Sequence, residues 1–261
     1  MNSKPVVIVT GASRGIGASV ARWLAGTGIA VTLLARSESA LRCEAEAIGR
    51  AGGDSLFLAG DVSEPLFCRS AVATTLDRFH RLDALVNNAG MVEPLSALAD
   101  ARPADWQYNI AVNLLGAVYM SMAAIGELRG RNGRIVNVSS GAAHAVIAAA
   151  SAYCAAKAAL NQFSRVLAAE EPDLTVIAVR PGVVDTRMQA ILRSQGPGKM
   201  PAEQAAFYTD LKTAGRLEPP QVPARAIAWL ALHAPREWSG AFMSYDDPRI
   251  AEPARATFGG G

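Results

Sequence analysis

Cysteine and histidine are scarce in this chain, and their scarcity limits its chemistry. The 261 residues include three cysteines and three histidines. Cys43, Cys68 and Cys154 show neither the paired spacing of a zinc site nor the density of a disulfide framework. The sequence therefore predicts no metal site and favours a reducing compartment.

Long apolar runs and long runs of one charge are also missing. No stretch approaches the ~20 uninterrupted apolar residues of a membrane span, and the first five residues do not begin an apolar signal region. The 25 basic and 23 acidic residues give a net charge of +2, with no block of either sign. We expect a cytoplasmic protein with neither a nucleic acid nor a membrane as its partner.

Short apolar runs, rich in β-branched residues, recur along the chain and predict strands buried on both faces. Hydrophobic residues make up 51% of the chain, enough for a large core. No repeat, low-complexity tract or linker divides it, so we expect a single domain over residues 1–261. The predicted strands are Val6–Thr10, Ala30–Leu34, Ser55–Ala59, Ala84–Val86, Arg134–Val138 and Thr175–Val179.

Helix-length, alanine-rich segments alternate with these strands. Such alternation predicts an α/β fold, a Rossmann-type doubly wound parallel sheet of about seven strands with helices on both faces. A last helix and strand complete it, and we expect the tail Ala254–Gly261 to be loose. The predicted helices are Ile16–Thr27, Glu38–Arg50, Pro65–Arg81, Pro103–Leu128, Ser151–Glu171 and Ala224–Leu232, and the last strand is Gly240–Ser244.

The segment 186–223 breaks this alternation. It is rich in glycine and proline, with a short predicted helix over Ala202–Thr213. An insertion near the carboxyl end of a sheet can act as a substrate lid, and it can equally be a plain surface excursion. Both interpretations stay open from the sequence.

A glycine-rich turn follows the first predicted strand and opens the first helix. It reads Thr10-Gly-Ala-Ser-Arg-Gly-Ile-Gly17. Glycines allow a tight turn and let the backbone approach a pyrophosphate, whose charge then faces the helix N-terminus. The spacing is a variant of the usual dinucleotide fingerprint, and its place between strand and helix strengthens the interpretation.

The residue after the second predicted strand indicates which dinucleotide binds. An acidic side chain there would favour NAD, but the chain has Arg36. A guanidinium suits a 2′-phosphate, and Arg14 in the glycine-rich turn can reach the same group. Two arginines and no acid predict NADP(H), unless both are ordinary solvated charges.

Tyr153 and Lys157 lie one helical turn apart on the same face of a predicted helix. A phenol has an unperturbed pKa of about 10. We expect the neighbouring ammonium to lower the pKa of Tyr153 toward neutrality, where acid–base catalysis is efficient. Taken alone, the pair also fits an ordinary amphipathic helix.

Several motifs occur together in a fixed order, and this order is more specific than any one of them. They are Thr10–Gly17, Asp61-Val62, Asn87-Asn-Ala-Gly90, Asn113, Ser139-Ser140, Tyr153-x-x-x-Lys157 and Pro181-Gly-Val-Val-Asp-Thr186. The set resembles the short-chain dehydrogenase/reductase family over nearly the whole chain, and most closely its sepiapterin reductase-like and benzil (diketone) reductase branch.

The resemblance implies a role for each of four catalytic residues. Tyr153 would be the general acid/base, and Lys157 would lower its pKa and bind the nicotinamide ribose. Ser140 would hold the substrate oxygen, with Ser139 as the alternative. Asn113 would support a water relay that feeds Lys157.

The resemblance also implies a set of cofactor contacts along the motifs. Asp61 and Val62 would contact the adenine, and Thr186 with the Val184 backbone would hold the carboxamide. The full set is Gly11, Ser13, Arg14, Gly15, Ile16, Gly17, Arg36, Ser37, Asp61, Val62, Asn87, Ala89, Gly90, Tyr153, Lys157, Pro181, Gly182, Val184 and Thr186.

Residues beside Ser140 and Tyr153 form a predicted substrate pocket that is mostly apolar. It suits a hydrophobic ketone better than a charged substrate. Its members are Met91, Ala142, His144, Val183, Met188, Phe207 and Tyr208.

One position departs from the sepiapterin reductase-like pattern. The aspartate that anchors the pterin in that branch falls on Ser244 in an ungapped comparison, which favours diketones and similar carbonyls. A small gap would place Asp246 there instead, and Asp247 is one residue further on.

The sequence thus predicts an NADPH-dependent carbonyl reductase that acts on a small-molecule ketone or diketone. One alternative is a dinucleotide-binding sensor or scaffold without turnover. Another is an NAD-dependent alcohol dehydrogenase that runs oxidatively. The resemblance further suggests a homodimer or homotetramer formed through the helices 103–128 and 151–171.

Overall fold

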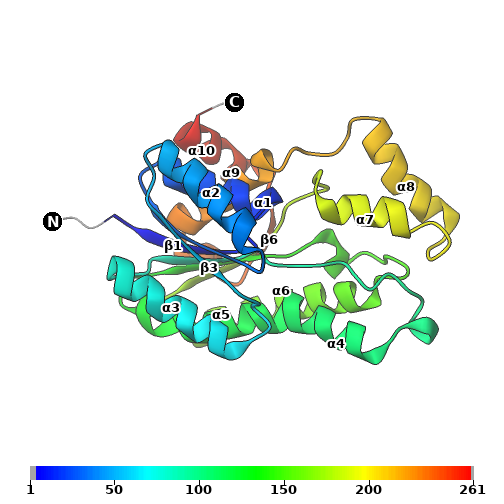
Figure 1. Ribbon diagram of the computed structural model, residues 1–261, viewed down its shortest axis with the longest axis horizontal. Helices are drawn as coiled ribbons and strands as arrows, with labels where there is room; N and C mark the ends of the chain where they lie inside the picture. Colours follow the sequence, from blue (N-terminus) through cyan, green and yellow to red (C-terminus); the bar gives the residue numbers. More distant parts are fainter. Residues whose placement is uncertain (1–3, 260–261) are drawn as a thin grey trace.

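A seven-stranded parallel sheet forms the centre of the molecule, and the computed structural model describes residues 4–259 around it (Figure 1). The strands follow the order β3-β2-β1-β4-β5-β6-β7, and every neighbouring pair is parallel. Their bounds are β1 Val6–Thr10, β2 Ala30–Ala35, β3 Ser55–Ala59, β4 Ala84–Asn87, β5 Arg134–Val138, β6 Thr175–Arg180 and β7 Phe242–Ser244. The predicted Rossmann-type fold is confirmed.

Both faces of the sheet are covered, which explains why its strands read as apolar runs. In β1, Val7 and Val9 pack into the cluster on one face, while Ile8 packs into the cluster on the other. Helices α1 (Gly15–Gly26), α2 (Glu38–Arg50), α9 (Gln221–His233) and α10 (Pro248–Phe258) cover the first face (Figure 1). Helices α3 (Pro65–Phe79), α5 (Gly116–Arg129) and α6 (Ser151–Glu170) cover the second, and α4 (Pro103–Ile110) packs beside α6.

The predicted helix 103–128 is interrupted at its centre. A π-helical segment, Ala111–Leu115, separates α4 from α5. Such segments widen one helical turn and are frequent at functional sites. This one carries Asn113, whose side-chain amide donates to the Asn109 carbonyl at 3.0 Å.

The chain continues in regular structure beyond the last strand, so the prediction of a loose tail from Ala254 is wrong up to Phe258. Helix α10 packs on α9 and buries Ile250 and Ala254. The Asp247 side chain begins the helix by accepting a hydrogen bond from the Arg249 amide at 3.0 Å. Residues 260–261 of the predicted tail lie outside the described range.

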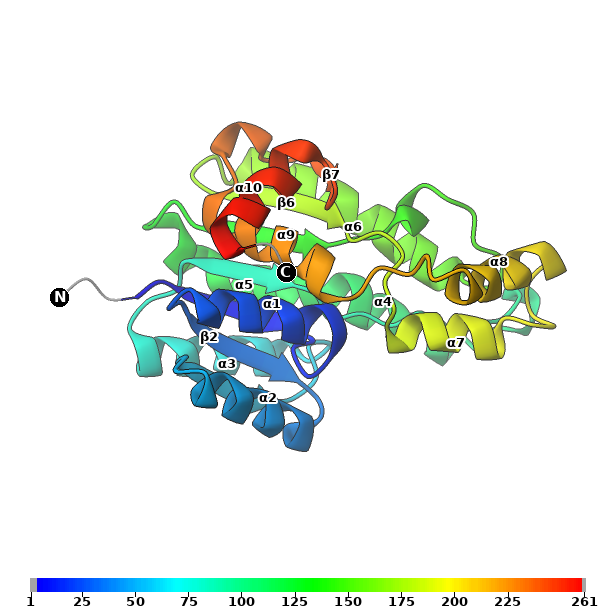
Figure 2. The same ribbon diagram turned by 90° about the horizontal axis from the view of Figure 1, so that it is seen from above.

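The segment 186–223 projects beyond the carboxyl edge of the sheet (Figure 2). It contains the predicted helix, now α8 (Ala202–Thr213), and also α7 (Arg187–Gln195), which was not predicted. Leu192 from α7 and Tyr208 from α8 pack into one apolar cluster that includes Tyr153. The segment therefore lies against the predicted catalytic residue.

The helical stretch Pro103–Arg129 is long and apolar enough to cross a membrane by length and composition, with a hydropathy of 1.5 over 18 residues. Its inner side packs on the sheet, where Met120, Ala124 and Leu128 are fully buried. It also carries Asn113. These contacts are those of a core helix.

Candidate active site

A cleft of about 720 Å³ opens at the carboxyl ends of the strands. It lies where the sheet reverses its order between β1 and β4, the position at which open α/β sheets bind ligands. The predicted cofactor residues that line it are Gly11, Ser13, Arg14, Gly15, Ile16, Arg36, Ser37, Asp61, Val62, Ala89, Gly90, Tyr153, Lys157, Pro181 and Thr186. Most of the predicted set is thus brought to one cleft.

The glycine-rich turn has the geometry of a cradle for an anion. Gly11 and Gly15 have φ of 65° and 57°, which favour glycine. A Cβ on Gly17 would overlap the Gly11 carbonyl oxygen and would lie only 2.5 Å from the side-chain amide nitrogen of Asn88. Gly17 itself is buried behind the cleft wall, so its part is to let α1 approach the turn closely.

Asn87 does not line the cleft, although it was predicted as a cofactor contact. Its side chain faces α5, near Ser121, and donates to the side-chain oxygen Oδ1 of Asn137 at 2.9 Å. Side chains alternate along a strand, so the next residue faces the other way. Asn88 lines the cleft instead and donates from its amide to the Thr10 carbonyl at 2.9 Å. Because Asn88 stands next to Asn87 in the predicted motif, the sequence could have pointed to Asn88 as well.

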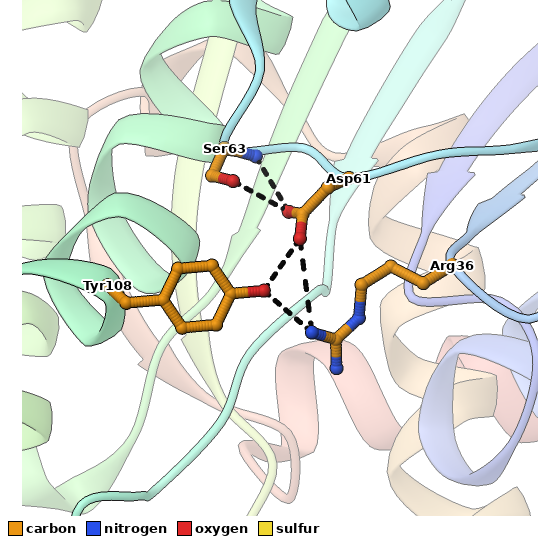
Figure 3. A network of polar contacts seen from close by, with 4 residues as sticks. All are labelled: Arg36, Asp61, Ser63 and Tyr108. Carbon is orange, nitrogen blue, oxygen red and sulfur yellow. Dashed lines mark hydrogen bonds and ion pairs between the residues drawn. The ribbon is translucent and has the colours of Figure 1, made fainter. Parts of the chain in front are cut away.

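Figure 3 shows a polar network across the mouth of the cleft. Arg36 donates to the Tyr108 hydroxyl at 2.6 Å, and that hydroxyl donates to Asp61 Oδ2 at 2.6 Å. The second Asp61 oxygen accepts from the Ser63 amide at 3.0 Å and from its hydroxyl at 2.9 Å. Burial raises the pKa of Asp61, but the hydrogen bonds from Tyr108 and Ser63 outweigh it and leave that pKa lowered.

Tyr108 is a residue of the site that sequence reasoning missed. It lies on α4, outside every motif, and α4 brings its ring to the ends of β2 and β3. No local pattern in the sequence signals this contact, because Tyr108 is 72 residues from Arg36.

Two further arginines face the same cleft as Arg36. Arg14 and Arg187 both line it, and the pKa of Arg14 is lowered by partial burial and by the nearby charges of Arg187 and Arg36. Like charges held together in a cleft favour an anionic ligand. Arg187 opens α7 and was not predicted as a contact.

Tyr153 lies at the base of the cleft with a side chain that is only 6% exposed. The Ser140 hydroxyl hydrogen-bonds to it, and Ser140 also accepts from the Ala142 amide at 3.1 Å. The Ser139 hydroxyl points away, within 3.5 Å of the Lys157 carbonyl oxygen. Of the two serines, the hydroxyl beside the phenol is therefore that of Ser140.

The predicted fall in the pKa of Tyr153 is wrong for this structure. Burial raises that pKa to about 12, and the hydrogen bond from Ser140 offsets this only in part. The Lys157 ammonium lies 5.8 Å from the centre of the tyrosine ring, and its hydrogen bond goes to the Val138 carbonyl rather than to the phenol. Tyr153 is consequently a neutral phenol at pH 7.

Lys157 is buried beside Tyr153, and its ammonium donates to the Val138 carbonyl at 2.8 Å. Burial lowers the pKa of Lys157 to about 8, because a charge is poorly solvated there. Its ammonium would lie 3.7 Å from a Cβ on Gly90. A Cβ at Gly90 would therefore make an ordinary contact with this amine.

Asn113 is fixed by the backbone of the loop after β4. Its amide donates to the Met91 carbonyl at 2.8 Å, and its oxygen accepts from the Met91 amide at 3.1 Å. A Cβ on Gly90 would lie 2.8 Å from that oxygen. The four predicted catalytic residues are thus brought together, with Asn113 and Lys157 on either side of Gly90.

Two predicted cofactor contacts on the loop after β6, Gly182 and Val184, are not among the residues that line the cleft. Val184 is buried and pairs with Glu218 in a short parallel bridge. Gly182 has φ of 75° and leaves room for Tyr245, whose ring carbon would lie 2.7 Å from a Cβ there. Both shape the loop that presents Pro181 and Thr186.

The predicted substrate residues separate into two groups. Met91 and Met188 line the cleft, and Ala142 and Tyr208 are buried in the apolar cluster around Tyr153. The other three lie further out. The His144 ring is 5.2 Å from that of Phe242, Phe207 is 49% exposed, and the Val183 carbonyl accepts from the Glu218 amide at 2.9 Å.

The carboxylates proposed to replace the pterin anchor do not line this cleft. Ser244 donates its hydroxyl to Asp246, and Asp246 lines a separate hollow together with residues of α9 and α10. Asp247 caps α10. The small-gap alternative for Asp246 therefore has no support in the geometry.

The chemistry of the cleft is that of proton transfer beside a dinucleotide-sized groove. Within residues 4–259, no group of three His, Cys, Asp or Glu side chains is placed to hold a metal ion. Tyr153 offers a proton, and Ser140 offers a second hydroxyl beside it. Two such hydroxyls can bind and protonate one substrate oxygen.

Comparison with known proteins identifies the family. Residues 5–196 match the model of the short chain dehydrogenases. An uncharacterized oxidoreductase of Saccharomyces cerevisiae is 36% identical over 251 residues, which cover 95% of this chain and 98% of the relative. Its crystal structure superposes with a TM-score of 0.90 over the same shares of the two chains.

Two further relatives carry names that describe their activity. A benzil reductase of Saccharomyces cerevisiae that forms (S)-benzoin is 31% identical over 259 residues, covering 94% of this chain and 97% of its own. The structure of an actinorhodin polyketide ketoreductase with NADPH is 28% identical, with a TM-score of 0.83 over 92% of this chain and 95% of its own. The chain belongs to the short-chain dehydrogenase family and is an oxidoreductase of the Rossmann fold.

Proposed function

We propose that this protein is an NADPH-dependent carbonyl reductase that acts on apolar ketones or diketones. One observation carries the proposal. The neutral Tyr153 phenol and the Ser140 hydroxyl meet at the base of the same cleft whose mouth holds the glycine-rich turn and the arginines.

The residues of the cleft fit a phosphorylated dinucleotide. The turn has no Cβ at Gly11 and Gly15 and lies at the N-terminus of α1, where an anion can approach the backbone. Arg14 and Arg36 would hold a 2′-phosphate, and Arg187 adds a third positive charge to the same cleft. When bound, the reduced cofactor supplies the hydride.

The chain's own residues bind the carbonyl and move the proton. Ser140 and Tyr153 would both donate to the substrate oxygen, and Tyr153 would give up its proton as charge develops there. A pKa of about 12 keeps Tyr153 protonated at neutral pH, the state needed to reduce a carbonyl. Lys157, held by Val138, is the nearest buried amine to resupply the proton.

The side of the cleft next to Tyr153 suits an apolar substrate. Met91, Met188 and Ile191 line the cleft together with the carboxylates of Glu93 and Asp185, whereas Asp246 of the C-terminal loop lines a separate hollow. The helices α7 and α8 cover this side and would act as the substrate lid. The likeness to a benzil reductase supports an aromatic diketone as a substrate.

The test is NADPH oxidation, followed at 340 nm, with a panel of benzil, simple 1,2-diketones and sepiapterin. We expect turnover of the apolar diketones. Tyr153→Phe should reduce kcat by about 10²–10⁴-fold, because it removes the proton donor. NADPH affinity, measured by fluorescence titration, should remain within about twofold, since the cradle is unchanged. Full activity in Tyr153→Phe would exclude this mechanism.

An NAD-dependent dehydrogenase running oxidatively is the second candidate. It is favoured by the ion pair between Arg36 and Asp61, 3.9 Å apart, which partly neutralises the arginine assigned to the 2′-phosphate. Titration of the protein with NADH and with NADPH separates the two candidates. Tighter binding of NADH would select the dehydrogenase.

A further inference from the structure

The network at the mouth of the cleft has an unusual arrangement of charges. The Arg36 guanidinium and the Asp61 carboxylate are 3.9 Å apart, and the Tyr108 hydroxyl lies between them (Figure 3). The hydroxyl uses both of its capacities, since it accepts from Arg36 and donates to Asp61. The ion pair is therefore bridged rather than direct.

Each member of the network comes from a different element. Arg36 follows β2, Asp61 follows β3, and Tyr108 reaches them from α4. Arg36 is 61% exposed, so nothing else packs its side chain firmly. Ser63 holds Asp61 in place with two hydrogen bonds, and Asp61 in turn orients the tyrosine hydroxyl.

The hydrogen bond that Arg36 donates to Tyr108 determines how many N–H donors of Arg36 remain for a ligand. A guanidinium has five N–H donors in a flat fork. Tyr108 takes one of them, and within residues 4–259 no other hydrogen bond to the Arg36 side chain is found. A direct, two-pronged pair with Asp61 would instead use the edge of the fork that a phosphate needs.

We propose that Tyr108 is a positioning residue that sets the preference of this cleft for a 2′-phosphorylated nucleotide. It holds Arg36 at the mouth and keeps it from pairing directly with Asp61. The inference rests on the proposed function, in which Arg36 contacts the 2′-phosphate of NADP(H).

The experiment uses the adenosine half of the two cofactors as probes, so that it needs no turnover. Isothermal titration measures the binding of 2′,5′-ADP and of 5′-ADP to the full-length protein. Tyr108→Phe keeps the ring and removes the bridging hydroxyl. We expect its affinity for 2′,5′-ADP to fall by about tenfold, because Arg36 loses the hydrogen bond that positions it, while that for 5′-ADP changes by less than about twofold.

Two further variants sharpen the result. Tyr119→Phe removes a hydroxyl from α5, away from the cleft, and should leave both affinities unchanged. Arg36→Ala should abolish most of the preference for 2′,5′-ADP. In that background Tyr108→Phe should add nothing, since the tyrosine acts through the arginine.

The outcomes separate this inference from the proposed function. An equal loss for both probes in Tyr108→Phe, or an unchanged ratio, overturns the role of Tyr108 even if the protein reduces diketones. Suppose that Tyr108→Phe loses the preference for 2′,5′-ADP over 5′-ADP, but the wild-type protein reduces no carbonyl. The role of Tyr108 then stands, and the proposed reductase activity is excluded. A wild-type protein that binds the two probes equally overturns both the role and the NADPH assignment.

Discussion

Single residues at the base of the cleft owe their chemistry to burial more than to their neighbours in sequence. Tyr153 and Lys157 are four positions apart in the sequence, and this spacing suggested a tyrosine acidified by a cation. In the fold, burial makes Tyr153 a weaker acid, with a pKa of about 12, and makes Lys157 a stronger one, with a pKa of about 8. Sequence shows which groups lie together, whereas the loss of water around them depends on α7, α8 and the sheet.

The lowered pKa of Lys157 predicts how stability depends on pH. The unfolded chain holds this proton up to a pKa near 10.5, while the folded chain releases it near 8. Below pH 8 the buried charge destabilises the fold in full, and the penalty disappears as pH rises toward 10.5. Between pH 7 and 9.5, the wild type should gain on the order of 2 kcal/mol relative to Lys157→Met.

The measurement is urea unfolding of both proteins at pH 7 and at pH 9.5. The difference between the two free energies of unfolding cancels the contribution of groups that titrate in both proteins. At pH 9.5 the tyrosines of the unfolded chain are still below their pKa. A gap between the two proteins that is the same at both pH values would contradict a buried, charged Lys157.

At the scale of elements, the helices and strands that could be predicted are those that a short stretch of sequence identifies by its own pattern of apolar residues. The strands were recognisable because their residues are apolar on both faces, and α8 was predicted with its observed bounds. Helices α7 and α10 were missed because they begin in segments rich in proline, glycine and charge, and Pro253 lies inside α10. Their stability comes from contacts made by Leu192 and Ile250, which no short window reveals.

Of the site, the sequence located the residues that belong to motifs and missed those supplied by packing. The residues of the glycine-rich turn, Ser140 and Lys157 were found. Tyr108 and Arg187 were not, since each reaches the cleft only because its helix is placed against a distant loop.

The junction of α1 with the loop after β4 depends on a glycine. A methyl group on Gly17 would overlap the Gly11 carbonyl and the Asn88 amide, both of which are part of the cradle. We expect Gly17→Ala to lose about 1–3 kcal/mol of stability and to weaken NADPH binding. Gly26→Ala, at the other end of α1, meets nothing within 4 Å and should be neutral or stabilise by up to about 1 kcal/mol.

Thermal unfolding with and without NADPH measures both effects. The two variants add the same methyl group to the same helix, so only the site differs. Equal stability of Gly17→Ala and Gly26→Ala would show that the close approach of α1 has no energetic consequence.

At the scale of the whole molecule, we propose a homodimer or homotetramer formed through the outer faces of α5 and α6. These helices carry exposed apolar side chains, with Met122 70% and Val166 43% exposed. Exposed apolar residues on neighbouring helices are suited to pairing with a second copy.

Negative charge on the outer faces of α5 and α6 should dissociate the oligomer into single chains. Met122→Glu combined with Val166→Glu should reduce the mass in solution to that of one chain, measured by light scattering after size exclusion. Val146→Glu changes an 86% exposed residue on the loop before α6 and should leave the mass unchanged. An unchanged mass in the double variant would remove this surface as the interface.

Asn88 closes the turn at Gly11 from a strand end 77 residues further along the chain. The turn at Gly11 therefore lacks this side-chain support in a chain that has only reached β3, however well β1 and α1 have formed. During synthesis, we expect the first half of the protein to fold locally and to bind a nucleotide more weakly than the complete chain. Tight nucleotide binding would then require that β4 has joined the sheet. Free cofactor would therefore stabilise completed molecules more than partial ones.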